Sequence, residues 1–356
     1  MKKLSIFAYA FYLTVTVSCK KNEDAGTNDF ENLKTQILVD FTNIVAVPGY
    51  QQLDAAATDL QTSIENLNND ATESNLATAR SAWKNMRGIW EQCEGYLFGP
   101  VEDNDYDPNM DTWPTDYVQL DSLLASNSPL SVANIQNLTL SLRGYHPIEY
   151  IIFGDHGSRT AASLTERQKL YVQSLATDLK NTCHSLYVSW VDEPVNFAKQ
   201  VMTAGAGSTV YSKKQEAYLA IIESMTGICE EVGEGKMKEP FDTRDPKTVE
   251  SPYSGNSVSD FKDNIIGVQN VYLGRLGSAD GKGLNDLVAA GNISLDNKIQ
   301  GQLTSAINSF NNISVNYEEA IITQRVQCQQ TMDALATLKE TLENELKPYI
   351  VQNIKD

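Results

Sequence analysis

The sequence predicts an all-α fold of two up-down helical bundles packed together. Apolar residues recur at alternating spacings of three and four over most of the 356 residues, a pattern typical of amphipathic helices. No stretch sustains the alternation at every second residue that marks a half-buried strand. Glycine and proline separate the apolar runs, as they do at helix ends, so the chain is expected to be a series of helices.

The first half of the chain is predicted to be an up-down bundle. Residues 30–44 and 53–67 each carry an apolar seam, and the Pro-Gly pair at 48–49 predicts a break between two helices. The clearest seam lies in residues 75–98, and the Gly-Pro pair at 99–100 ends it.

The second half begins with a long helix. Thr165 and Gln168 have the spacing of a capping box, and a long apolar seam follows them. A glycine-rich turn comes next, and residues 218–232 are expected to return antiparallel to that helix. Because residues equidistant from such a turn lie level, we expect Cys183 and Cys229 to face each other, either bridged or as two buried thiols.

Three further seams, in residues 261–272, 295–310 and 321–342, complete the helical series. The order of the elements fits two bundles, which we place at residues 29–160 and 161–356. A chain of this length is sufficient for two ordinary domains with real cores.

The first 18 residues are predicted to be a lipoprotein signal peptide. Two lysines precede an uncharged apolar run at residues 4–17, which is too short to span a bilayer comfortably. Cys19 ends a loose match to a lipobox, so it is expected to carry the acyl chains of a membrane anchor. An ordinary cleaved signal with an incidental cysteine is the alternative. The lack of Asp after Cys19 favours the outer membrane, at its periplasmic face or the cell surface, and residues 19–28 form a flexible tether.

The formal charge of −18 argues against two classes of partner. Such a surface repels the phosphates of nucleic acids and anionic headgroups, so no nucleic-acid partner is expected and a cation is the better candidate. Solubility alone is the alternative explanation of the bulk charge. No cysteine pair has CxxC spacing, which indicates neither a zinc knuckle nor a thioredoxin-type site.

The segment at residues 142–150 is the most suggestive of chemistry. Pro147 suits the first position of a helix, which would make His146 the N-cap and Glu149 the third residue. An imidazole nitrogen and a carboxylate on one helix end can bind a single cation together. The alternative is that Glu149 reaches back to cap its own helix start.

Charged residues on the helix of residues 75–98 add a second clue. Arg87 and Glu94 fall on the shoulder of the apolar seam, and Glu91 lies just beyond it. Charges so close to a packed seam are costly unless they are paired or liganded. The alternative is an Arg87–Glu91 ion pair at i,i+4 with the remaining charge in solvent.

Three ordered blocks of residues resemble the imelysin family. Gly144-x-His146-x-x-Glu149 is similar to that family's GxHxxE signature. The earlier and later blocks span roughly residues 80–275, in the family's order. The residues that carry them are Trp83, Arg87, Trp90, Glu91, Glu94, Phe98, Gly99, Pro100, Val101, Asp111, Trp113, Pro114 and Asp116, and then Glu250, Ser251, Pro252, Tyr253, Ser254, Ser257, Asp260, Asn264 and Tyr272.

The resemblance implies a two-bundle helical fold whose motif residues gather near the domain junction. Family members are exported proteins often linked to iron uptake, and the first one described was called a peptidase. His146 and Glu149 carry over onto the signature. The residues that carry over as site neighbours are Trp83, Arg87, Glu91, Glu94, Trp113, Asp116, Gly144, Glu250, Ser254, Asp260 and Asn264.

These observations support three functions. The first is a metal-binding lipoprotein that works with the proteins of an iron-acquisition system and is not an enzyme. His146 and Glu149 would be ligands to iron or zinc, and one or two of Glu91, Glu94, Asp116 and Asp260 would complete the shell. The second is a zinc metallopeptidase, which would need a further ligand and a general base. The third is a module that binds an organic ligand or a partner protein in the interdomain cleft.

Overall fold

The computed structural model describes residues 23–355. Almost all of the regular secondary structure in this range is helical. The prediction of an all-α fold is confirmed, with 77% of the described residues in helices. The only strands in the described part are β1 (Arg275–Leu276) and β2 (Ala279–Asp280), which pair antiparallel. The predicted signal peptide and Cys19 lie outside the described residues. No helix from residue 23 to residue 355 is both long and apolar enough to cross a membrane.

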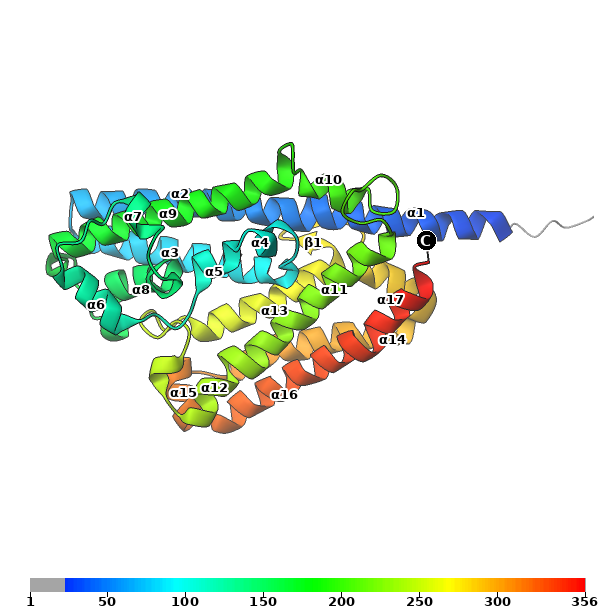
Figure 1. Cartoon of the computed structure of the whole chain (residues 1–356). Coiled ribbons are helices and arrows are strands. Elements are labelled where there is room, and N and C mark those ends of the chain that lie inside the picture. The colour runs from blue at the N-terminus through cyan, green and yellow to red at the C-terminus, as the bar shows by residue number, and fades with distance from the viewer. Residues whose placement is uncertain (1–22, 356) are drawn as a thin grey trace, which may run out of the picture.

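The first helices form one continuous rod (Figure 1). It contains α1 (Glu23–Asp40), the π-helical segment η1 (Phe41–Ala46) and α2 (Val47–Asn69), so α1 begins inside the predicted tether. The predicted break at residues 48–49 is therefore wrong. The π-helical η1 turn ends just before α2, and Pro48 lies in the first turn of α2, so the rod passes through the proline without a break.

Two long helices pack against α2. A Thr72-capped turn leads to α3 (Glu73–Cys93), which continues into the 3-10 segment η2 (Glu94–Tyr96). The predicted capping box of Thr165 and Gln168 opens α9 (Glu166–Val191), which lies along α2 (Figure 1). The division placed between residues 160 and 161 thus separates α9 from the helix against which it packs. The cause is the apolar seam of α9, which is buried on α2 and not on the long helix of residues 214–230.

Short helices connect α3 to α9 and carry part of the site. They are α4 (Pro100–Asp103), α5 (Tyr106–Asp111), α6 (Tyr117–Ala125), α7 (Val132–Ile135) and α8 (Tyr145–Phe153). Single 3-10 turns complete the connections, at Leu140–Leu142, Asp155–Gly157 and Ala161–Ser163.

The second group of helices covers the other face of α3. It is built from α11 (Lys214–Glu230), α13 (Ser257–Leu273), α14 (Leu284–Ser309) and α16 (Arg325–Thr341), with α13 in contact with α3. The shorter elements of this half are α10 (Phe197–Met202), the π-helical η6 (Glu231–Lys236), α12 (Lys238–Thr243), η7 (Pro246–Thr248), η8 (Phe310–Asn312), α15 (Tyr317–Thr323), η9 (Leu342–Leu346) and α17 (Lys347–Asn353).

The predicted pairing of Cys183 with Cys229 is not found, because α9 packs on α2 and not on α11. Both residues are buried free thiols. The Sγ of Cys183 lies 3.4 Å from the Sδ of Met110, while Cys229 belongs to α11 in the second group of helices.

Two glycines set the contact between the helical groups. A Cβ added to Gly267 of α13 would lie 2.3 Å from the carbonyl oxygen of Gln92, and one added to Gly95 would lie 2.8 Å from the backbone of Gly267. Both distances are far shorter than a van der Waals contact. Only glycine therefore allows the backbones of α13 and the end of α3 to approach so closely, and this closeness shields the space between them from water.

We expect Gly267→Ala to destabilise the fold by about 2 kcal/mol or more, because the new methyl group must push α13 away from α3. The free energy of unfolding in urea measures the effect. Gly301→Ala on the exposed face of α14 is the control, since its Cβ meets no atom within 4 Å. That change should be neutral or stabilise the helix by about 0.5–1 kcal/mol. Equal stability of the two variants would contradict the close-approach argument.

Candidate functional site

The candidate site is a network of buried charged side chains between the two helical groups. It draws on α3, η2, α5, α8, η6, α13 and the loop that precedes α13. The carboxylates are Glu91, Glu94, Asp111, Glu149, Glu250 and Asp260, and the basic side chains are Arg87, His146 and Lys236. Each of these side chains is at most 3% exposed.

Arg87 is the centre of this network. Its guanidinium forms ion pairs with Glu91 and Asp111, and its Nη2 lies 3.0 Å from Glu250 Oε1. Its Nε lies 3.8 Å from Asp260 Oδ2. Burial opposes the charge of the guanidinium, but these carboxylates outweigh burial and raise the pKa of Arg87 well above its usual value. Arg87 therefore stays charged and joins carboxylates from four separate segments.

Asp111, at the end of α5, orients the histidine of the signature. Its Oδ2 accepts a hydrogen bond from Trp90 Nε1 at 2.7 Å, and its Oδ1 lies 3.0 Å from His146 Nε2. Burial would raise the pKa of this carboxyl, but Arg87 and His146 lower it well below its usual value. Because Asp111 stays ionised, it fixes the proton of His146 on Nε2.

Gly144 makes this contact between α5 and α8 possible. It is the N-cap of α8 at φ +76°, and a Cβ there would lie 1.8 Å from the carbonyl oxygen of Met110. The helix thus begins at Tyr145, so the prediction of His146 as N-cap and Glu149 as third residue is wrong. Gly144 adopts the positive φ at the N-cap, so the helix begins two residues earlier than predicted.

His146 and Glu149 face each other with two unpartnered atoms. His146 Nδ1 lies 3.6 Å from Glu149 Oε2, and neither atom has a hydrogen-bond partner. The other oxygen, Oε1, accepts hydrogen bonds from the backbone N–H groups of Tyr253 and Ser254 and from the hydroxyl of Ser254, at 2.7–3.1 Å. Glu149 therefore holds the loop before α13 and does not cap its own helix.

Lys236 of η6 is the second buried cation. Its Nζ lies 3.0 Å from both Glu94 Oε2 and Glu250 Oε1, and 3.5 Å from Glu91 Oε2. Asn264 of α13 donates to Glu91 Oε2 at 2.7 Å and also to Glu94. Hydrogen bonds from neighbouring groups thus complement the ion pairs of the same carboxylates.

Asp260 lies at the edge of the network. Its Oδ2 accepts a hydrogen bond from the Ser251 hydroxyl at 2.6 Å, and its Oδ1 accepts one from the Asn256 amide. Burial raises the pKa of this carboxyl, despite the attraction of Arg87. Burial likewise raises the pKa of Glu91, and it raises that of Glu94 to about 8 although Lys236 opposes the shift.

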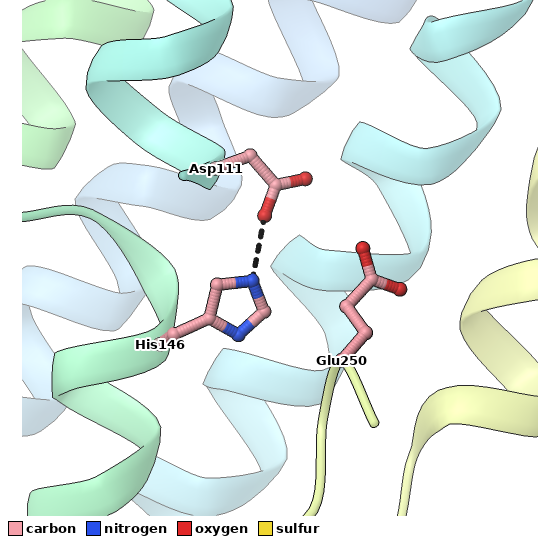
Figure 2. Close-up of side chains that lie close together, drawn as sticks. All are labelled: Asp111, His146 and Glu250. Carbon is pink, nitrogen blue, oxygen red and sulfur yellow. Dashed lines mark hydrogen bonds and ion pairs between the residues drawn. The ribbon is translucent and has the colours of Figure 1, made fainter. Parts of the chain in front are cut away.

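The network contains more acids than bases, six carboxylates against three basic side chains. An unpaired charge in a buried environment is costly, so the excess acids must hold protons or face a further cation. Among the residues described, three groups have ligand atoms within 4.8 Å of one another and could hold a metal ion. They are Asp111, His146 and Glu250; Glu91, Glu250 and Asp260; and Glu91, Glu94 and Asp111. Figure 2 shows the first group, with Glu250 reaching from its loop toward the Asp111–His146 pair.

Most of the residues predicted for the site come together. His146, Glu149, Arg87, Glu91, Glu94, Glu250, Ser254, Asp260 and Asn264 contact one another through the bonds described above. Trp83 supports α8 through a hydrogen bond from Nε1 to the Tyr145 carbonyl at 3.1 Å. Whether any of them binds a metal stays a prediction.

Two predicted residues have other positions. Asp116 is the N-cap of α6, where its side chain accepts a hydrogen bond from the Gln119 backbone at 2.9 Å. Trp113 lies on the loop between α5 and α6, and its indole N–H has no partner.

Sequence reasoning missed Asp111 and Lys236 as members of the site. Asp111 lies in the same motif block as Asp116. It ends a six-residue helix, which is too short to show the apolar repeat that would indicate a buried position. Lys236 closely follows three acids, Glu230, Glu231 and Glu234, and such a run of charges is typical of a solvent-exposed helix face. No local signal distinguished it.

Two pockets lie beside the network. One of about 670 Å³ is lined by Tyr117, Tyr253 and Glu318, among others, and Tyr253 is also a backbone donor to Glu149. The other, of about 550 Å³, is lined by acidic residues that include Glu94 and Glu231. Both of these acids pair with Lys236, so the second pocket borders the buried cation.

Comparison with known proteins gives consistent matches over most of the chain. The family model described as Imelysin matches residues 46–344. The "Iron-regulated protein A" of Synechococcus elongatus is 29% identical over 332 residues, which cover 89% of this chain and 87% of that protein.

Two crystal structures have the same fold. A putative iron-regulated protein A precursor from Parabacteroides distasonis aligns with a TM-score of 0.81 and 22% identity, over 96% of this chain and 98% of that one. An imelysin-like protein from Psychrobacter arcticum aligns with a TM-score of 0.73 and 14% identity, over 90% of this chain and 96% of that one.

We expect the protein to be less stable at pH 9 than at pH 6. Burial opposes the imidazolium of His146, but the hydrogen-bonded carboxylate of Asp111 and the nearby carboxylate of Glu149 raise its pKa from 6.5 to about 9. Its contribution to stability is present below pH 6.5 and is lost as the pH rises through 9. Glu94, with a pKa of about 8 against 4.5, also binds its proton more tightly in the folded state, so its effect has the same sign.

Thermal melts at pH 6, 7.5 and 9 measure this effect, and we expect the midpoint to fall by about 5 °C or more. The control is the double variant His146→Gln, Glu94→Gln, which should show a flatter pH profile. A wild-type midpoint that stays constant or rises toward pH 9 would contradict the assignment.

Proposed function

The chain belongs to the imelysin family. We propose that it is an exported protein that binds a metal ion between His146 and Glu149, and that it takes part in iron uptake. The relative named "Iron-regulated protein A" supports the connection with iron. The buried acid-rich network supports the binding of a cation.

One observation carries the proposal, the orientation of His146 by Asp111. The carboxylate accepts the Nε2–H, so Nδ1 is the nitrogen that faces Glu149 Oε2, and both facing atoms are buried and unpartnered. A bound metal ion would replace the proton that Nδ1 carries in the imidazolium. Their separation of 3.6 Å is close to the spacing of about 3–3.5 Å between two ligands of one ion at bond lengths of about 2.1 Å. A carboxylate behind a ligating imidazole is the usual support of a metal-bound histidine.

The donor set favours a particular class of metal. An imidazole nitrogen with carboxylate oxygens suits iron or zinc, and Glu250 is a further oxygen donor near His146. The four cysteines in the described part of the chain are buried free thiols, and none belongs to a group that could hold an ion. We therefore propose iron, with zinc as the ion that competes for the same atoms.

Export rests on the N-terminal sequence. The lysines and the apolar run before Cys19 support a lipoprotein signal peptide, and we propose that acylated Cys19 anchors the protein to the outer membrane. In that place the protein would meet incoming iron and the partner proteins of an acquisition system.

A zinc metallopeptidase is the second candidate, favoured by the Asp111, His146 and Glu250 group. Such an enzyme needs a metal-bound water and a path for a peptide to reach it. The side chains of His146 and Glu149 are 1% and 0% exposed, so a peptide bond has no direct access to either residue. This burial favours ion binding over peptide hydrolysis.

A module that binds an organic ligand is the third candidate. The pocket of about 670 Å³ beside Tyr117 and Tyr253 has a suitable volume for a small ligand. Because Tyr253 is bonded to Glu149, a ligand in this pocket would lie next to the proposed ion site.

We expect His146→Ala to lower the affinity for Fe²⁺ and Zn²⁺ at least tenfold, because the variant loses the only nitrogen ligand. Asp111→Asn should cost between about tenfold and a hundredfold through loss of orientation. Metal analysis of purified protein and calorimetric titration measure both effects. His184→Ala is the control, since His184 pairs with Asp54 on the exposed side of α9. Equal iron and zinc contents in wild type and His146→Ala would refute the site.

For the peptidase alternative, we expect no zinc-dependent cleavage of an unfolded protein substrate by the wild-type chain, because the site is closed to peptides. The measurement is a digest with and without added zinc, run beside Glu149→Gln. Cleavage that requires zinc and disappears in Glu149→Gln would establish the peptidase in place of our first choice.

A further inference from the structure

The environment of Lys236 resembles the coordination of a metal ion by carboxylates. Four carboxylate oxygens surround its Nζ, from Glu94 and Glu250 at 3.0 Å, Glu91 at 3.5 Å and Glu231 at 3.6 Å. They come from α3, η2, the loop before α13 and η6 itself. The Lys236 side chain is 3% exposed, so solvent takes little part in balancing these charges.

Three of these carboxylates also contribute to the groups that could hold an ion. Glu91 belongs to two of the three such groups, once with Glu250 and Asp260 and once with Glu94 and Asp111. The ammonium of Lys236 lies against Glu91, Glu94 and Glu250, at least one of which belongs to each group. The ammonium group of Lys236 therefore neutralises carboxylates that could otherwise bind a metal ion.

We propose that Lys236 is a built-in cation that fills a second ion position in the network and so keeps a metal ion out of it. The inference rests on the proposed function in one respect: the ion between His146 and Glu149 is then the only one that this buried network binds.

The physics of buried charge supports this role. Removal of Lys236 leaves Glu91 and Glu250 with Arg87 as their remaining basic partner, and it takes from Glu94 the ion pair with Lys236. Uncompensated buried carboxylates take up protons or a cation. Because the donors around Nζ are all oxygens, the vacant position should select a hard divalent ion such as Mn²⁺ or Ca²⁺.

A route for the ion already exists. The acidic pocket of about 550 Å³ is lined by Glu94 and Glu231, which are both partners of Lys236. Its other charged lining residues, Glu102, Asp105, Asp107 and Glu223, are also acids. A cation drawn into this pocket therefore reaches Glu94 and Glu231, the two lining carboxylates that pair with Lys236.

The test counts bound Mn²⁺ in the full chain, by calorimetry and by electron paramagnetic resonance of the free ion. We expect Lys236→Met to bind one ion more than wild type, and Mn²⁺ to raise the melting temperature of the variant more than that of wild type. The control is Lys238→Met, two residues away, where an exposed lysine pairs only with Asp242. It should bind the same number of ions as wild type.

Lys236→Gln is measured in parallel, because its amide retains two hydrogen-bond donors for the carboxylates if the methionine variant does not fold. An equal count of ions in wild type and in both Lys236 variants overturns the inference. One ion in wild type and two in the variant supports both proposals. No ion in wild type and one in the variant supports the role of Lys236 and refutes the site at His146 and Glu149.

Discussion

The ion pairs of Arg87 are the interaction on which the rest of the structure depends. Six carboxylates lie buried between the helical groups, and an isolated buried charge costs several kcal/mol. Arg87 offsets this cost for Glu91, Asp111, Glu250 and Asp260 at once, because its guanidinium has donors on several sides. It ties α3 to α5, to α13 and to the loop before α13.

The close approach of α13 to α3 and the buried charges require each other. Gly95 and Gly267 let the two backbones meet, and the contact buries Arg87 and Glu91, whose side chains are 0% exposed. Buried carboxylates need partners within the protein, and Asn264 of α13 supplies one for Glu91 and Glu94. Packing therefore determines the electrostatics here, and the electrostatics fixes the register of the helices.

The sequence predicts what depends on local pattern and misses what depends on which helices become neighbours. Apolar seams and the capping box of Thr165 mark the helices, and charges near the seam of α3 mark a buried cluster. The pairing of Cys183 with Cys229 failed because α9 has an equally apolar alternative in α2, and periodicity cannot rank two partners. Asp111 and Lys236 were missed because a short helix and a π-helical turn have no repeat to reveal a buried side.

The same buried network also limits the chemistry that the protein can perform. A hydrolytic centre needs an open coordination position and room for substrate, whereas the facing atoms of His146 and Glu149 are enclosed by α8 and by the loop that Glu149 itself holds. The loop residues Tyr253 and Ser254 bond to the oxygen of Glu149 that does not face His146. These three hydrogen bonds fix the Glu149 carboxylate in the absence of an ion, so the proposed ion site is preformed. Rigidity of this kind favours selective binding of one small cation, because a larger substrate could enter only after Tyr253 and Ser254 had released Glu149.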